Sequence, residues 1–115
     1  MLRADHNPIE LNIKGDHILF EPDQVEKMFG RVTHAYVAID SDKNRINISS
    51  VANTWFTKVH AGAAQMMLKQ RNLDGIRSLN IRPFIIDLDI EDLSAVTIDS
   101  SFSEKTGLIQ IELNE

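Results

Sequence analysis

The stretch NTWFTKVHAGAAQMMLKQR, from Asn53 to Arg71, decides which fold the sequence predicts. Asn53 is suited to cap the free amides of a first helical turn, and the residues after it are rich in good helix formers. The bulky apolar residues recur at three- and four-residue spacing, which places them on one stripe of a helix. This stripe comprises Trp55, Phe56, Val59, Ala63, Met66 and Met67. We therefore predict one long helix over 53–71 that covers a sheet.

The opposite side of this predicted helix has little polar surface. It carries Ala61, Ala64 and Leu68, with Lys58 and Lys69 as a narrow polar border. A helix on an open surface normally has a broader polar side. Either the alanines are simply helix formers beside a lone exposed leucine, or this side is an interface with a second copy. Both interpretations remain open. The second is our working hypothesis, a homo-oligomer with a dimer as the first expectation.

The length and composition of the chain predict one folded domain. The chain has 115 residues, of which 43% are hydrophobic and 25% charged, as in globular proteins. We expect a flexible arm over 1–7 and a single α+β domain over 8–115. The absence of cysteine excludes disulfides, thiolate nucleophiles and cysteine-based zinc sites. The N-terminus lacks a secretory signal and no apolar run is long enough for a membrane span, so we expect a cytoplasmic protein.

The charges are unevenly distributed along the chain. Residues 58–82 carry five basic side chains and one acidic one, 5 − 1 = +4, whereas residues 83–115 carry one basic and eight acidic ones, 1 − 8 = −7. The two regions either neutralise each other within one molecule or form a two-signed surface suited to contact between copies. The net charge of −5 argues against general binding of nucleic acid.

The rest of the chain predicts strands and one short helix. Two N-terminal hairpins are expected over 8–20 and 32–51, with a short helix between them that begins at Pro22 and ends at Gly30. Strict alternation predicts a strand over 84–90, with apolar residues on one side and Asp87, Asp89 and Glu91 on the other. Two further strands follow at 95–98 and 108–113. The predicted fold is therefore α+β, with two N-terminal hairpins and a C-terminal three-strand meander, mainly antiparallel and covered by one long and one short helix.

The candidate chemical sites are weak. The loop over 40–44 has the first ligand positions of a calcium-binding loop, but Arg45 and Val51 replace the glycine and the bidentate acid, so we predict a hairpin turn and no metal site. His60 could act as an acid or base, or as a metal ligand, with Asp87 or Asp89 if the fold brings them together. Otherwise these carboxylates form a solvated strand face. No motif for a cofactor is present.

These patterns support three hypotheses of function. The leading one is a non-catalytic, self-associating cytoplasmic domain that binds a protein partner or a small apolar ligand. The first alternative is a small enzyme that uses His60 with Asp87 or Asp89. The second is a regulatory nucleic-acid binder that uses Lys58, Lys69 and Arg71, although the nearby aromatic residues fall on the buried stripe of the predicted helix.

Overall fold

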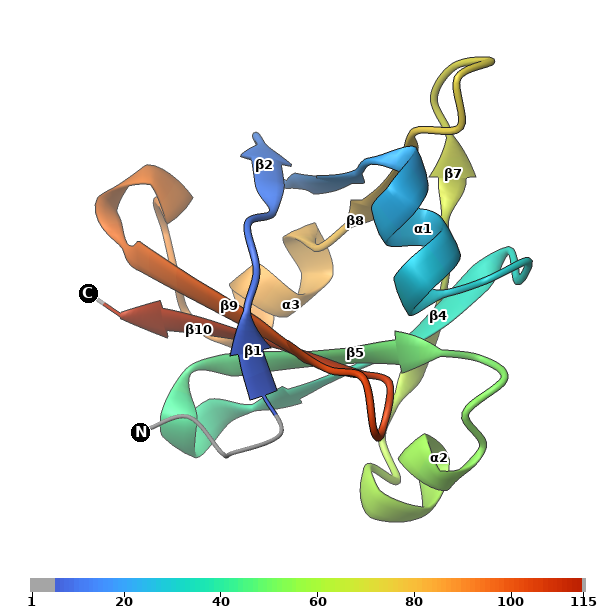
Figure 1. Ribbon diagram of the computed structural model, residues 1–115. Coiled ribbons are helices and arrows are strands. Elements are labelled where there is room, and N and C mark those ends of the chain that lie inside the picture. The colour runs from blue at the N-terminus through green and yellow to red at the C-terminus, as the bar shows by residue number, and fades with distance from the viewer. Residues whose placement is uncertain (1–5, 115) are drawn as a thin grey trace.

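Ten strands form two antiparallel sheets in residues 6–114, the part of the chain that the computed structural model describes (Figure 1). The larger sheet has the order β1-β9-β10-β5-β4-β6. Its strands are β1 His6–Pro8, β9 Thr97–Ser103, β10 Leu108–Asn114, β5 Arg45–Ser50, β4 His34–Asp40 and β6 Ala64–Met67. The smaller sheet has the order β2-β3-β8-β7. Its strands are β2 Asn12–Lys14, β3 His17–Phe20, β8 Arg77–Asn80 and β7 Lys69–Gln70.

In this described part of the chain, three short helices complete the fold, namely α1 Pro22–Met28, α2 Trp55–Val59 and α3 Arg82–Asp87. Two single 3-10 turns, η1 Ser41–Lys43 and η2 Leu93–Ala95, lie before β5 and β9. Within residues 6–114, no helix has the length and apolar character that a membrane span requires. The predicted α+β class with mainly antiparallel pairing is confirmed.

The main core lies between the two sheets and is closed by α1 and α3. The smaller sheet contributes Ile18, Phe20 and Leu79, which are fully buried, and the larger sheet contributes the apolar residues of one of its faces. In the larger sheet these are Ala35, Val37, Ile46, Ile48, Phe102, Ile109, Ile111 and Leu113. We call this the inner face. The opposite, outer face is mostly polar, and α2 covers part of it through the buried Phe56, which packs with Ala38 and Leu108.

The predicted hairpins and the short helix are present. β2 pairs with β3 through a turn at Gly15, and β4 pairs with β5. The last two strands of the predicted meander also pair, as β9 and β10, but β9 covers Thr97–Ser103 rather than 95–98. In α1, Pro22 begins the helix, and the Glu21 amide donates to Gln24 Oε1 at 3.0 Å to form one half of a capping box. Gly30 follows the helix with a φ of +70°.

The predicted long helix over 53–71 is wrong. The helix ends at Val59, the chain turns, and β6 begins at Ala64. In 64–68 the side chains of Ala64, Met66 and Leu68 point to the core, so this segment has the period of two of a strand. The Leu68 amide donates to the Thr33 carbonyl at 2.8 Å, which continues the pairing with β4. The strand formed because β4 offers an unpaired edge, and no single-sequence propensity records such an edge.

The predicted strand over 84–90 is also wrong. Residues 82–87 form α3, with Pro83 in its first turn. Phe84, Ile85 and Leu88 are buried and share one helical face, whereas Ile86 is 60% exposed. A strand with strict alternation would bury Ile86 and expose Ile85. The same residues also fit a helical period, and packing selected the helix. The C-terminal meander is therefore a two-strand hairpin.

The predicted N-terminal arm falls partly outside the described residues, because these begin at His6. His6 and Asn7 belong to β1, where they pair with Ser103 and Phe102 of β9. The last residues of the predicted arm, His6 and Asn7, are thus part of the edge strand of the larger sheet.

Candidate functional site

The structure distributes the five predicted interface residues over several elements. Leu68 is 1% exposed and belongs to the main core, and Ala64 faces the same core. Lys58 is exposed on α2, Ala61 lies in the following turn, and Lys69 begins β7 of the smaller sheet. The helical face that was expected to hold them together does not exist.

The larger sheet separates His60 from Asp87 and Asp89. The ring of His60 packs on Phe56 at a centroid distance of 4.6 Å, and Phe56 lies on the outer face. Asp87 ends α3, which packs on the inner face, and Asp89 follows it with a φ of +59°. Residues 6–114 contain no group of three or more histidine, aspartate or glutamate side chains that could hold a metal ion. The acid–base pair considered from the sequence is not assembled.

Only two of the three basic residues considered for nucleic acid are separated from the aromatic ones, because Lys58 shares α2 with Trp55. Lys69 and Arg71 lie in the β7–β8 hairpin of the smaller sheet, whereas Trp55 is on α2. Phe56 is fully buried between Trp55, at 5.7 Å, and Tyr36, which stacks on it at 6.0 Å. Its faces are occupied within the protein, so it offers no stacking surface to a base.

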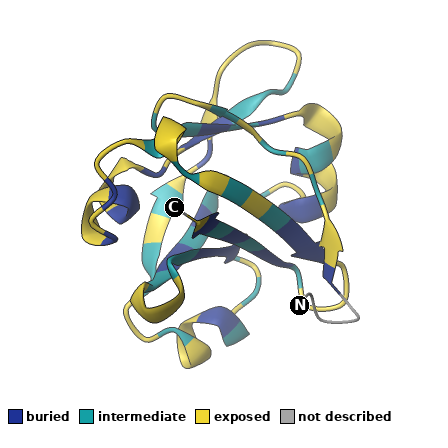
Figure 2. Cartoon of the chain, turned by 90° about the vertical axis from the view of Figure 1, so that its left-hand side faces the viewer, coloured by how far each residue is buried: buried dark blue, intermediate teal, exposed yellow. Residues whose placement is uncertain are grey.

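A different site lies along the first half of β9, which has a neighbouring strand on one side only among residues 6–114. β1 pairs with residues 101–103, and the Ile9 amide makes the last contact, to the Ser100 carbonyl at 3.0 Å. After Ile9 the chain continues to β2 in the smaller sheet, whereas β10 pairs with β9 along its whole length. Figure 1 shows β9 extending beyond β1 on the left, and Figure 2 shows the molecule from this side. Along β9, exposed and half-buried residues alternate in the first half, and the last three residues are buried.

The hydrogen-bonding groups of Ile98 point to this open edge. The Leu113 amide donates to the Asn44 carbonyl at 2.9 Å, on the side of β10 that faces β5. Ile98 is the residue opposite Leu113 on β9. In an antiparallel ladder, its backbone amide and carbonyl are therefore directed away from β10. Ser100 shares that edge because alternate residues point the same way. Among residues 6–114, neither Ile98 nor the Ser100 amide has a hydrogen-bond partner there.

Three adjoining hollows flank the open edge, and all of them are lined by Ile98. The hollow between β9, the 9–13 segment and the start of α1 has a volume of 670 Å³. The one beside η2 has 350 Å³, and the one that reaches the outer face has 420 Å³. We call them together the β9 groove, which is lined by residues 8–13, 15–16, 91–94 and 98–101, with Glu21, Gln24 and Glu112.

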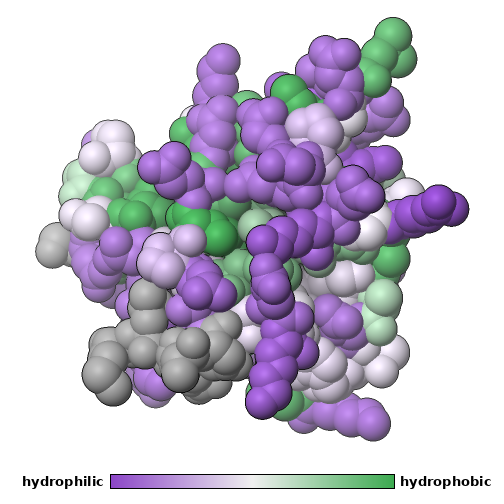
Figure 3. All heavy atoms as spheres, viewed as in Figure 1, coloured by the Kyte–Doolittle hydropathy of each residue, from purple (hydrophilic) through white to green (hydrophobic). Residues whose placement is uncertain are grey.

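The floor of the β9 groove is apolar. Five of its lining residues are half-buried and pack against the main core, namely Ile9, Leu11, Ile13, Leu93 and Ile98. In the space-filling view, apolar atoms are visible in this region with hydrophilic residues around them (Figure 3). Such a floor leaves apolar surface that a ligand side chain would remove from water.

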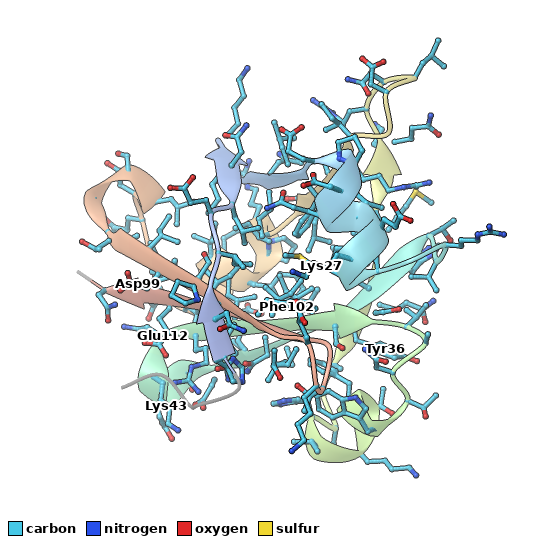
Figure 4. All side chains as sticks on the ribbon, in the orientation of Figure 1. Lys27, Tyr36, Lys43, Asp99, Phe102 and Glu112 are labelled. Carbon is cyan, nitrogen blue, oxygen red and sulfur yellow. The ribbon has the colours of Figure 1, made fainter. Side chains whose placement is uncertain are left out.

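The rim of the groove is acidic. Among residues 6–114, seven carboxylates line it and no lysine or arginine does, the seven being Glu10, Asp16, Glu21, Glu91, Asp92, Asp99 and Glu112. Asp99 and Glu112 are opposite each other on β9 and β10 (Figure 4). Glu112 is paired with Arg45 at 2.8 Å, and Asp16 lies 4.0 Å from Arg82. The other five have no ion-pair partner among residues 6–114.

One of these carboxylates is held in its charged form by its neighbour. The Ser94 hydroxyl donates to Asp92 Oδ1 at 2.6 Å, and the Ser94 amide donates to the same oxygen at 3.0 Å. These two hydrogen bonds, the one from the side chain first, lower the pKa of Asp92 below its ordinary value. The rim therefore keeps a negative charge at this position to a lower pH than an aspartate without these hydrogen bonds would.

Sequence reasoning missed this site because its parts come from separate segments. The alternation of Ile9, Leu11 and Ile13 with polar residues is visible in the sequence, but it predicts only a half-buried strand. That these residues lie beside residues 91–94 and 98–100 follows from the topology. Comparison of the chain with protein-family models, curated proteins and solved structures finds no match.

Proposed function

We propose that this chain is a non-catalytic protein-binding domain, which takes an extended, basic segment of a partner protein into the β9 groove as an added strand. The observation that supports this most strongly is the open half of β9, whose free amides and carbonyl lie between an apolar floor and an acidic rim. Unpaired strand edges are the surfaces at which extended peptides add to sheets.

The groove provides both features by which an added strand is recognised, namely free backbone hydrogen-bonding groups and pockets for alternate side chains. The groups of Ile98 and the Ser100 amide supply backbone hydrogen bonds that do not depend on the partner's sequence. Side chains of an added strand alternate between the two faces of the sheet. On the inner side they meet the apolar floor near Ile13 and Leu93, and on the outer side they meet the hollow at Asp99 and Glu112.

The acidic rim favours cationic side chains in the partner. Asp99 lies directly opposite Glu112. Arg45 neutralises the charge of Glu112, with which it forms an ion pair, but not the charge of Asp99. A lysine or arginine beside Asp99 would relieve this repulsion between like charges. Carboxylates around a groove also attract basic segments over a distance, which raises the association rate and makes it sensitive to salt.

A hydrolytic alternative has one observation in its favour, a serine–histidine contact next to the groove. His6 Nδ1 lies 3.3 Å from Ser101 Oγ, and Ser101 lines the outer hollow. Both residues are buried, with exposed fractions of 5% and 4%. A nucleophile must reach its substrate, so this burial favours a structural contact that joins β1 to β9.

Binding of a short synthetic peptide with alternating lysine and valine tests the proposal. In fluorescence anisotropy we expect this peptide to bind and a matched glutamate–valine peptide not to bind. Ser100→Pro removes the free amide but no hydrogen bond of the β9–β10 ladder, so it should weaken binding about tenfold while the melting temperature changes little.

Ser100→Ala is the matched control, because it keeps the amide and should bind as the wild type does. Equal affinity of Ser100→Pro and wild type would exclude strand addition at this edge. Equal affinity for both peptides would exclude the role of the acidic rim.

A further inference from the structure

The β7–β8 hairpin projects from the body of the molecule and carries the charge opposite to that of the groove. It spans residues 69–77, KQRNLDGIR, with three basic side chains and one acidic one, 3 − 1 = +2. In Figures 1 and 2 the loop between its strands extends beyond every neighbouring element. At its tip Leu73 is 99% exposed. Leu73 is flanked by Lys69 and Arg71 on one arm and by Arg77 on the other. An exposed apolar side chain with cations on both sides is suited to insertion into an apolar pocket with an acidic border.

The hairpin tip is held in shape by its own hydrogen bonds. Asn72 Oδ1 accepts from the amides of Asp74 at 3.0 Å and Ile76 at 3.3 Å, and the Arg71 amide donates to the Ile76 carbonyl at 2.9 Å. Gly75 closes the turn with a φ of +94°. A tip that is ordered before binding loses less conformational entropy on docking, which favours its use as a binding element.

The first arm of the hairpin is itself an open strand edge. Because the Arg71 amide donates to Ile76 on the second arm, the backbone groups of Gln70 point to the other side, where no strand within residues 6–114 neighbours β7. Lys69 and Arg71 are two residues apart, so their side chains share one face of the strand. Both are exposed, and neither forms an ion pair within residues 6–114. This arm therefore combines free backbone groups with two cations, as the β9 groove requires.

The geometry points to a second copy of this chain as a partner: we infer that the β7–β8 hairpin of one molecule docks in the β9 groove of the next, with Leu73 on the apolar floor and Lys69 and Arg71 at the acidic rim. This inference rests on the proposed strand-binding function and names its occupant. The hairpin and the open half of β9 are at different sides of the molecule in Figure 1. The contact is therefore heterologous, and it generates a ring or an open chain of subunits rather than an isologous dimer.

Charge reversal with complementation tests this inference in the full-length protein. The groove variant is Glu10→Lys with Glu91→Lys, and the hairpin variant is Lys69→Glu with Arg71→Glu; all four side chains are exposed. In sedimentation velocity over a range of concentrations, we expect the wild type to associate and either variant alone to associate at least about tenfold more weakly. Mixing the two variants should restore association, because each reversed surface then meets a reversed partner.

A matched control keeps the change in net charge but places it elsewhere. Glu26→Lys with Asp42→Lys alters two exposed acids outside the groove and should leave association unchanged. A monomeric wild type at the highest concentration, or association that neither reversal weakens, would overturn the inference. Loss of association in both variants without restoration on mixing would also overturn it.

The peptide experiment separates this inference from the proposed function. If the wild type stays monomeric but still binds the lysine–valine peptide, and Ser100→Pro weakens that binding about tenfold, the groove receives a basic strand from another protein. If the peptide does not bind and the wild type does not associate, both proposals fail.

Discussion

At the residue scale, Asn53 has a different role from the helix cap that its sequence position predicts. Its side-chain amide donates to Ser49 Oγ at 2.8 Å, and Ser49 Oγ donates to the Gly107 carbonyl at 2.9 Å. α2 begins two residues later, at Trp55. The side chain therefore connects the end of β5 to the turn between β9 and β10, and this turn must approach it closely.

Gly107 is the residue that allows this close approach. It has a φ of +76°, and a methyl group added to it would lie 2.6 Å from Asn53 Nδ2. We expect Gly107→Ala to lower the free energy of unfolding by about 1–3 kcal/mol, because the backbone is strained and the amide is displaced. Chemical denaturation measures this loss.

Gly62→Ala is the control for that substitution. Nothing lies within 4 Å of its added methyl group, and its φ is not in the left-handed region. We expect its stability to equal or slightly exceed that of the wild type, by about 0.4–1 kcal/mol at most. Equal stability of the two alanine variants would show that the Gly107 turn tolerates a side chain.

At the element scale, segments with one dominant pattern folded as the sequence predicts. The pairs β2–β3, β4–β5 and β9–β10 and the helix α1 each have turn or cap residues that leave little choice of local structure. Segments 64–68 and 82–87 instead carry apolar residues compatible with both a period of two and a helical period. There the neighbouring elements decided, because burial of the better-packed face outweighs small differences in propensity.

The neighbours Met67 and Leu68 distinguish the strand from the predicted helix. Met67 is 59% exposed and Leu68 is 1% exposed in the core. We expect Leu68→Ala to lose about 2–5 kcal/mol of unfolding free energy, since it leaves a cavity, and Met67→Ala to lose less than about 0.5 kcal/mol. In the predicted helix Met67 was on the buried stripe and Leu68 on the far side. The reverse order of losses in thermal or chemical denaturation would favour that helix.

At the scale of the whole molecule, the two sheets share one core and one continuous chain segment. Residues 64–70 pass from β6 to β7, and Leu68 between them is buried among residues of both sheets. Ile18 and Leu79 of the smaller sheet are as fully buried as Ile48 and Ile109 of the larger one. The inner face of each sheet is covered by the other sheet, so we expect both sheets to unfold together.

Native-state hydrogen exchange tests this cooperativity. The amides of Ile18 and Leu79, which are paired in the smaller sheet, should exchange with the same free energy as those of Ile48 and Ile109. Leu68→Ala should lower all four values equally, because it weakens the shared core. Faster exchange in the smaller sheet alone, in the wild type, would show that this sheet opens independently.

The sequence by itself determined the α+β class, the two N-terminal hairpins, α1, and the separation of basic and acidic segments along the chain. These features depend on turn residues, capping residues and charges that act within a few positions of one another. Only the tertiary structure decided that 64–68 is a strand and 82–87 a helix, because an open edge of β4 and the space beneath the sheet exist only after distant segments have met. The β9 groove is of the same kind: its floor and rim come from residues 8–24, 91–101 and 112, and only the fold brings them together.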